Sequence, residues 1–215
     1  EVKAKYAKNL VTGFLRLNGT TVGILANQSL ENEGLLDIDA SKKGAEFINF
    51  CDAFNIPIVS ITDAGGFKAS LEEEQRGIVK YVSKLIYAFT NATVPKVNII
   101  VRKAFGTAYI AMNSKHIGAD MVFAWPSAQI SVMNPEGAVN IMYADELKAA
   151  SDPAALRAEK VKEFSEMQSS PYTVASRGYI DDIIEPAATR KRVIAALEML
   201  YSKREERPAK KHGSL

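Results

Sequence analysis

The sequence has few of the side chains on which most catalytic and metal sites are built. It contains one cysteine, Cys51, and two histidines, His116 and His212, among 215 residues. A single cysteine excludes an intrachain disulfide or a thiolate metal site and is typical of a reducing, intracellular compartment. The HExxH, CxxC, Gly-x-Ser-x-Gly and Walker patterns are missing, so the sequence predicts no metal centre in this chain and no phosphate loop.

The sequence also has no large excess of basic or acidic residues and no long apolar run. The 27 basic and 25 acidic residues give a formal net charge of +2, which argues against a nucleic-acid partner. No window approaches the roughly 20 apolar residues that span a bilayer. Basic residues cluster only at 204–211, which we interpret as a solvated terminal segment rather than a binding patch. Because the chain begins at Glu1 without a methionine, we expect it to be trimmed at its start.

An alternation of strand and helix patterns is present instead. Asn18-Gly19 separates two apolar runs and predicts a β-hairpin. The runs "IPIVSIT" and "VPKVNIIV" each contain a proline, read as strands, and lead into a small-residue turn followed by a helical pattern. This repetition predicts an α/β fold, with residues 1–215 forming a single domain.

Helix signals place the remaining elements. The sequence predicts a helix capped by Asp39 or Ser41, and a long helix from a Ser70–Glu73 capping box to Asn91. Further expected elements are strands at 121–124 and 129–132, a helix in "MNPEGAVNIMY", an amphipathic helix capped by Asp152, a short strand in "GYIDDIIEP" and a closing helix over 189–204. The core side of the first helix is predicted to carry Ala45, Ile48, Phe50, Cys51 and Phe54.

Two small-residue turns are the candidate functional features. Ala64-Gly65-Gly66 and Gly106-Thr107-Ala108 each follow a predicted strand and are expected to open a helix. Unpaired N–H groups at such a turn point outward, and small residues let a ligand oxygen approach them, which is the geometry of an oxyanion site. The alternative interpretation is that the glycines only permit a tight turn.

The sequence supports catalytic side chains less strongly than it supports the two turns. Cys51 is either a reactive nucleophile or a small buried hydrophobe, and burial is typical of free cysteines. His116, in "NSKHIGAD", is either a general base or a hydrogen-bonded histidine at a helix end.

Long stretches resemble a known family. "KGAEFINFCDAFNIPIVSITDAGGF", "YAFTNATVPKVNIIVRKAFGTAYIAMNSKHIGADMVFAWPSAQISVMNPEGAVNI" and "KREERPAKKHG" are similar to the carboxyltransferase subunit of biotin-dependent acyl-CoA carboxylases and to the related decarboxylase α subunits. The resemblance runs from about residue 5 to the last residue. It covers the C-terminal half of that subunit and implies a crotonase-like ββα superhelix, with the N-terminal acyl-CoA-binding half absent from this chain.

The resemblance implies transfer of a carboxyl group between carboxybiotin and a short acyl-CoA of the propionyl-CoA, methylmalonyl-CoA or acetyl-CoA type. Biotin, carried on a partner protein, then supplies the base, so no catalytic triad is needed. The implied partners are biotin carboxyl carrier protein, biotin carboxylase or membrane decarboxylase subunits, and the N-terminal carboxyltransferase half. A homo-oligomer between dimer and hexamer is implied too, in the cytoplasm, with the bacterial cytosol favoured over the mitochondrial matrix.

The family's Gly-Gly-Ala-Tyr turn corresponds to Gly106-Thr107-Ala108-Tyr109 here. The resemblance implies that the amides of Thr107 and Ala108 stabilise the ureido oxygen of biotin. It also implies that Tyr109 and Ile110 belong to the substrate-binding residues, with Ile110 lining the acyl pocket. The family's second loop corresponds to Ala64, Gly65, Gly66 and Phe67, implied to contact substrate. Thr107 replaces a glycine, which stiffens the turn, and the prolines usual in the second loop are lost.

The sequence leaves two alternatives to the carboxyltransferase function open. Under the first, the chain is a non-catalytic scaffold or binding half of such an assembly. Under the second, it is a lone crotonase-type hydratase or hydrolase. The last alternative needs a carboxylate pair or a Ser-His couple near the turns, for which Glu136 and His116 are the candidates.

Overall fold

A computed structural model describes residues 1–208 of the chain and is built on one mostly parallel sheet. Over these residues seven strands pair in the order β1-β2-β3-β4-β5-β7, and β6 adds to the end of β4. The strands are β1 (Leu10–Leu17), β2 (Thr20–Asn27), β3 (Ile58–Ala64), β4 (Lys96–Phe105), β5 (Met121–Ala124), β6 (Gln129–Ser131) and β7 (Asp182–Ile183). The β1–β2 pair is antiparallel and the other pairs are parallel, which confirms the α/β prediction.

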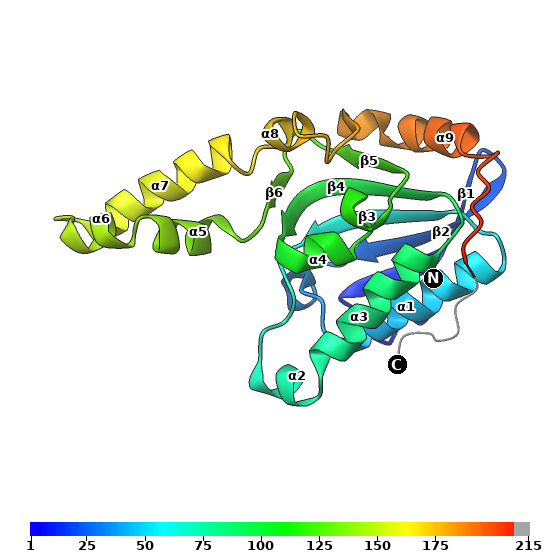
Figure 1. The fold of residues 1–215 in the computed structure, drawn as a ribbon, viewed down its shortest axis with the longest axis horizontal. Helices are drawn as coiled ribbons and strands as arrows, with labels where there is room; N and C mark the ends of the chain where they lie inside the picture. The colour runs from blue at the N-terminus through cyan, green and yellow to red at the C-terminus, as the bar shows by residue number, and fades with distance from the viewer. Residues whose placement is uncertain (209–215) are drawn as a thin grey trace.

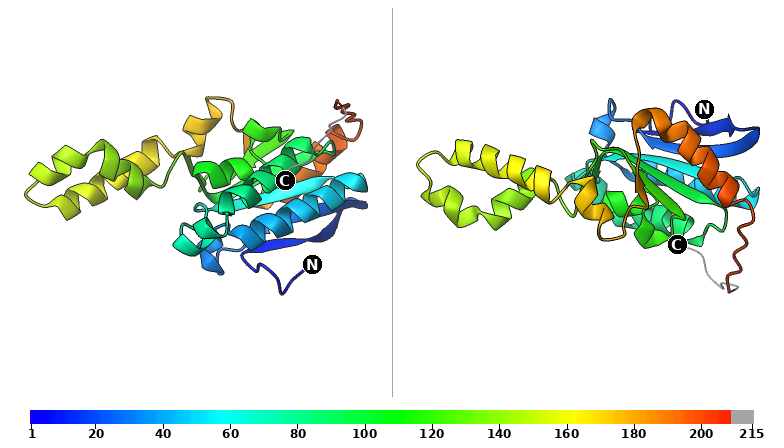
Figure 2. Two further views of the ribbon diagram at one scale, coloured as in Figure 1. Left: turned by 60° about the horizontal axis from the view of Figure 1, so that its bottom comes forward. Right: turned by 90° about the horizontal axis from the view of Figure 1, so that it is seen from above.

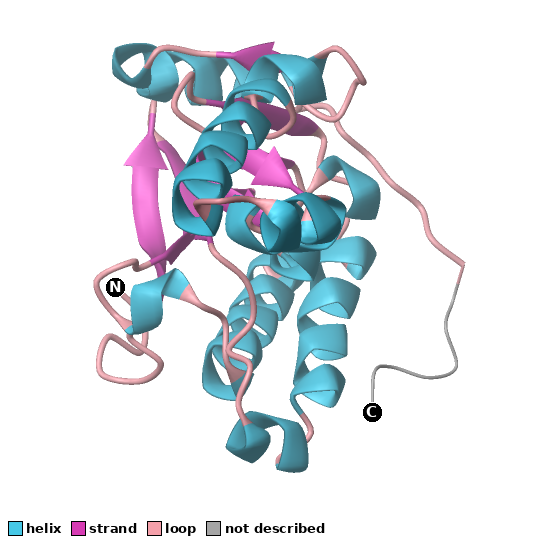
Figure 3. Ribbon diagram, turned by 90° about the vertical axis from the view of Figure 1, so that its left-hand side faces the viewer, coloured by secondary structure: helices cyan, strands magenta, loops and turns pink. Residues whose placement is uncertain are grey.

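Helices cover both faces of the sheet (Figures 1 and 2). Helices α1 (Ile38–Ala53) and α3 (Ile78–Asn91) pack side by side on one face, and α9 (Thr189–Met199) lies on the other. Figure 3 shows the strands between these two helical layers. Because both faces are covered, β3 and β4 are bulky and uncharged along most of their length, as parallel strands usually are.

The initial hairpin forms as the sequence predicts. Asn18 and Gly19 have φ values of +47° and +81°, and Leu17 pairs with Thr20. Positive φ at both central residues is the turn that matches the twist of the two strands, and Asn-Gly adopts it at low cost.

The start of α1 differs from the prediction. Asp37, rather than Asp39 or Ser41, is the cap, and its Oδ1 accepts a hydrogen bond from the Ala40 amide at 2.8 Å. Asp39 lies inside the first turn, where a carboxylate also favours the positive end of the helix.

Fewer of the predicted core side chains of α1 are buried than the sequence indicates. Ala45, Ile48 and Cys51 are buried, but Phe50 and Phe54 are 46% and 65% exposed. They instead form an aromatic row with Phe14 of the edge strand β1, with ring centroids 5.9 Å apart for Phe14–Phe50 and 4.6 Å for Phe50–Phe54.

The predicted long helix is broken in two. The Ser70 side chain accepts from the Glu73 amide as expected, but α2 ends after one turn (Leu71–Gln75) and α3 starts at Ile78. Gly77 separates them with φ +80°. The Glu73 carboxylate accepts a hydrogen bond from the Ile38 amide at 2.9 Å, so it caps α1 rather than its own helix.

A helical arm projects from the sheet, as Figures 1 and 2 show at the left. It contains α5 (Pro135–Met142), α6 (Ala144–Ala149) and α7 (Pro153–Met167), and the chain returns to the sheet through α8 (Pro171–Ala175). Asn134 and Asp152 cap α5 and α7, and Pro135 and Pro153 take their first positions, as predicted. None of the side chains of α7 is fully buried, but Leu156, Val161 and Phe164 are half-buried on one side of the helix, which packs against α5 and α6.

The end of the chain is less regular than expected. The strand in "GYIDDIIEP" has only two residues, β6 stops at Ser131, and α9 ends at Met199 rather than residue 204. Residues 209–211 of the basic segment and His212 lie outside the described residues. Within residues 1–208, no helix combines the length and the apolar character that crossing a bilayer requires.

Candidate active site

The two candidate turns lie next to each other at the carboxyl edge of the sheet. Strands β3 and β4 are parallel neighbours, and Ala64 pairs with Ala104. The turns after these strands therefore leave the sheet side by side. This edge is where ligands bind in many open parallel sheets.

Gly106 is required by the backbone at the second turn. Its φ is +61°, in the region that side-chain-bearing residues rarely adopt, and a Cβ built on it would lie 3.4 Å from the Val132 carbonyl oxygen. The strand before it is held on its other edge by β6, with Phe105 paired to Ser131. A six-residue helix, α4 (Gly106–Ala111), follows directly.

The amides predicted to act at this turn belong to the first turn of a helix. No carbonyl of α4 accepts the N–H of Thr107 or Ala108, and within residues 1–208 neither a side chain nor a loop carbonyl accepts either of them. Thr107 is exposed, Gly106 is half-buried and Ala108 is buried. Of the two amides, that of Thr107 therefore belongs to an exposed residue and that of Ala108 to a fully buried one.

The next two residues, Tyr109 and Ile110, pack into an apolar cluster beside the turn. Tyr109 is 6% exposed, and burial raises the pKa of its phenol to about 12. Its hydroxyl is buried without a hydrogen-bond partner in the described part of the chain. Ile110 is half-buried and packs against the same apolar cluster.

The Ala64–Phe67 turn leads to α2, which Ser70 caps as the sequence predicts, but the turn itself does not form the first turn of that helix. Phe67 forms a parallel bridge with Leu36, and α2 starts only at Leu71. The Gly66 carbonyl accepts the Leu36 amide at 3.1 Å, and Gly66 has φ +150°. The turn pairs in an extended conformation with the Leu36 segment and does not form the first turn of a helix. It therefore lacks the free first-turn amides that an oxyanion site needs.

Cys51 and His116 take the structural alternatives. Cys51 is fully buried, and burial raises the pKa of its thiol to about 12. His116 is exposed in a short 3₁₀ helix, stacked on Tyr179 with ring centroids 4.7 Å apart, and its Nδ1 lies 3.3 Å from the Ser114 hydroxyl.

That Ser114–His116 pair does not resemble a hydrolase couple. Ser114 is fully buried, and its hydroxyl donates to the Ile110 carbonyl at 3.1 Å, so it is not presented to a substrate. Glu136 is exposed on the first turn of α5, out on the helical arm. The residues that a lone hydratase or hydrolase would need are therefore not assembled at the turns.

A buried polar network lies beneath α4, and the sequence patterns did not predict it. Thr62 donates to Asn98 Oδ1 at 2.8 Å and contacts the Met112 carbonyl at 3.3 Å, while Asn113 donates to the Ser60 hydroxyl at 3.1 Å. These bonds tie the end of α4 to the middle of β3 and β4. The available signal was the presence of Ser60, Thr62 and Asn98 inside two otherwise apolar strand patterns.

The sequence patterns did not predict the pairing of Asp63 with Arg102 either. The two residues come from the ends of β3 and β4 and form a bidentate ion pair, with Arg102 Nη2 2.8 Å from Asp63 Oδ2. The hydrogen bond to Asp63 raises the pKa of Arg102. Nothing in the linear spacing of residues 63 and 102 indicates that they meet.

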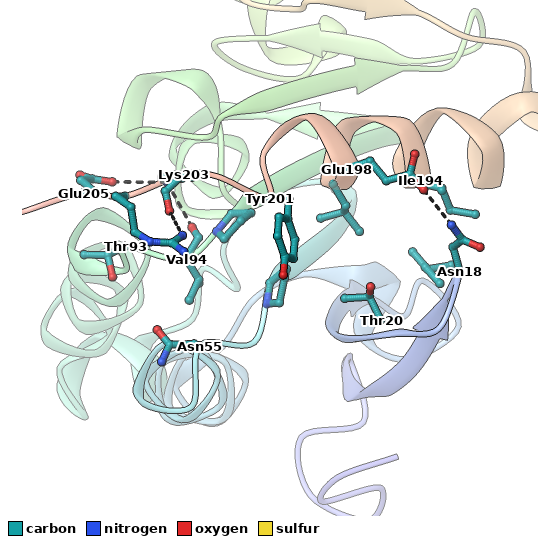
Figure 4. A pocket seen from close by; sticks show the side chains of 15 residues that line it. Asn18, Thr20, Asn55, Thr93, Val94, Ile194, Glu198, Tyr201, Lys203 and Glu205 are labelled. Carbon is teal, nitrogen blue, oxygen red and sulfur yellow. Dashed lines mark hydrogen bonds and ion pairs between the residues drawn. The ribbon is translucent and has the colours of Figure 1, made fainter.

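A cavity of about 750 Å³ lies away from the two turns, at the amino ends of the parallel strands (Figure 4). It is bounded by the hairpin turn at Asn18, by Pro57 and Pro95 before β3 and β4, and by Tyr201 and Lys203 after α9. Among residues 1–208, no group of three or more histidine, cysteine or acidic side chains is arranged to hold a metal ion.

Comparison with known proteins identifies close relatives. The chain is 55% identical over 214 residues to the carboxyltransferase subunit of propionyl-CoA carboxylase from Haloferax mediterranei, covering 100% of this chain and 42% of that protein. It is 50% identical over 215 residues to methylmalonyl-CoA decarboxylase subunit alpha from Propionigenium modestum, again covering 100% of this chain and 42% of the relative. The chain therefore spans about two fifths of the length of these relatives.

A solved structure shares the fold. The transcarboxylase 12S subunit, crystallised as a hexamer with methylmalonyl-coenzyme A and methylmalonic acid bound, superposes with a TM-score of 0.94 at 53% identity, over 98% of this chain and 41% of that one. The crotonase-like α/β fold implied by the resemblance is confirmed. The sequence pattern of the carboxyl transferase domain matches residues 1–215, so the chain belongs to the carboxyl transferase domain family.

Proposed function

We propose that this chain provides the biotin-side half of a carboxyltransferase active site that acts on a short acyl-CoA of the propionyl-CoA or methylmalonyl-CoA type. The observation that carries the proposal is the Gly106 turn, where the Thr107 and Ala108 amides lie in the first turn of α4 and have no acceptor in that helix. Carboxyl transfer develops negative charge on oxygen, and fixed backbone donors are suited to stabilise it.

The turn fits biotin as a cofactor carried by a partner protein. When bound, biotin would supply the transferable carboxyl group and the base, so this chain needs no base of its own. Gly106 would permit the turn, and the amides of Thr107 and Ala108 would hold an oxygen that becomes negative. The exposure of Thr107 supports access from outside, and the β-branched side chain would stiffen the turn rather than remove its donor.

The acyl side of the site is a further part of this proposal. Ile110 follows the turn and is half-buried, and an apolar residue at that place suits a short aliphatic acyl group. Ala64, Gly65, Gly66 and Phe67 would border the same space from β3, since Ala64 pairs with Ala104. Relatives named for propionyl-CoA and methylmalonyl-CoA support this substrate class.

A reconstitution experiment tests the proposed activity. The full chain is combined with an N-terminal carboxyltransferase half from a relative and with a carboxylated biotin carrier protein, and transfer of the carboxyl group to propionyl-CoA is followed. We expect transfer that depends on all three components. Assembly of the components without transfer would contradict the proposal and favour a non-catalytic scaffold.

We also infer that the chain works within a larger assembly in the cytoplasm. The helical arm exposes apolar side chains to solvent, including Ile141 at 69%, Met142 at 59% and Met167 at 61%, which is more apolar surface than an isolated arm requires. Their replacement by charge tests the idea: I141D should shift the mass measured by light scattering toward the monomer. An unchanged mass would remove the arm from the interface.

A further inference from the structure

Strand β4 is irregular just before the Gly106 turn. Thr62 of β3 pairs with Ile100, but Ala64, two residues on, pairs with Ala104, four residues on. Two additional residues of β4 are therefore accommodated over this stretch. Such a bulge bends a strand and redirects the residues that come after it, and bulges recur next to functional sites.

The side chain of Asp63 spans this irregularity. Its Oδ1 accepts the main-chain amide of Lys103 at 3.1 Å, and its two carboxylate oxygens accept the Arg102 guanidinium through Nε at 3.2 and 3.1 Å and Nη2 at 2.8 Å. Asp63 itself is 9% exposed. Its amide donates to the Asn27 side chain at 3.2 Å, so the residue is also tied to strand β2.

The bond to the Lys103 amide is the contact that reaches the site. Lys103 precedes Gly106 by three residues, and β6 holds the opposite edge of this stretch through its pairs with Lys103, Ala104 and Phe105. The Asp63 carboxylate and β6 therefore fix the backbone from two sides immediately before the turn. The Arg102 side chain is 56% exposed, so its ion pair alone contributes little to stability.

We propose that Asp63 is a positioning residue that aims the Thr107 and Ala108 amides by holding the bulge of β4; this rests on the proposed function. The acting contact is the one to the Lys103 amide. The Arg102 guanidinium occupies the remaining carboxylate lone pairs and keeps the carboxylate in place. Asp63 touches neither substrate nor cofactor in this role.

Asp120 provides a matched control at the other end of the same strand. Its Oδ2 accepts the main-chain amide of Lys96, the first residue of β4, at 2.8 Å and the Lys203 ammonium at 2.9 Å. Replacing Asp120 thus removes the same kinds of bond, one to a β4 amide and one to a cation, at the amino end of the strand. Its loss should affect stability without changing the Gly106 turn.

The experiment compares D63A, D63N, R102Q and D120A in the reconstituted transfer assay, at temperatures where each is folded by circular dichroism. We expect D63A to lower kcat about 100-fold, the effect of losing an oxyanion donor, with the KM for acyl-CoA changed less than about twofold. R102Q retains the carboxylate and should lower kcat less than about tenfold. D63N retains one acceptor oxygen and should fall between them, while D120A should keep the kcat of the unmodified chain.

A second readout does not depend on activity. Hydrogen exchange of the peptide spanning 101–112 should speed up in D63A and stay unchanged in D120A, whereas that of the hairpin at 10–27 should not respond to D63A. Wild-type kcat in D63A, equal losses in D63A and D120A, or unaltered exchange at 101–112 would each overturn the role of Asp63. Failure of the unmodified chain to transfer carboxyl groups would instead contradict the proposed function, which separates the two ideas.

Discussion

Replacing Gly106 by alanine tests the candidate turn most directly. The φ of +61° lies in the left-handed region, where an alanine costs about 1–2 kcal/mol. The new Cβ would lie 3.4 Å from the Val132 carbonyl oxygen, which is contact rather than overlap. G106A should therefore fold with a stability reduced by about that amount. We expect the turn to relieve this strain by moving one of its amides out of alignment, so transfer should fall about 100- to 1,000-fold.

Gly19 offers a control with the same backbone requirement. Its φ is +81°, and a Cβ built there would meet nothing within 4 Å. G19A should lose a similar free energy of unfolding, measured by urea titration, while its transfer rate stays at the wild-type value, because Gly19 lies in the β1–β2 turn at the other end of the sheet. Unimpaired transfer by G106A, or equal losses of transfer in both variants, would refute the assignment of this turn.

Three further expectations concern titratable side chains. Burial lowers the pKa of Lys96 from 10.5 to about 8, so below pH 8 its charge disfavours the folded state by about 3 kcal/mol. Stability of the unmodified chain relative to K96M should therefore rise between about pH 8 and 10.5 in urea titrations; a flat difference would contradict this. Cys51, with its pKa raised to about 12 by burial, should resist a thiol reagent at pH 8 until the chain is unfolded, and stoichiometric labelling of the folded chain would refute its burial. H116A should retain transfer within about threefold, because His116 stacks on Tyr179 and is not placed as a base at the turn; a loss comparable to that of G106A would assign it a catalytic part.

The sequence was a good guide wherever one local rule decided the conformation. Asn18-Gly19 fixes its turn through positive φ at both residues, and Asp152-Pro153 starts α7 because one side chain caps the first amides and the proline needs none. It failed where a partner distant in the chain decided the outcome. Phe50 and Phe54 were expected on the core side of α1, yet they stay exposed in an aromatic row with Phe14 of β1.

The sequence by itself determined the alternation of strands and helices, the family, and the small-residue turn at Gly106, because each depends on residues close together in the chain. Only the tertiary structure decided that the two turns emerge side by side, that Phe50 and Phe54 stay exposed, and that Asp63 meets Arg102 and the Lys103 amide. The reason is physical: a hydrogen bond or a buried contact between residues about 40 apart in sequence depends on strand order and register, which no local pattern of side chains encodes.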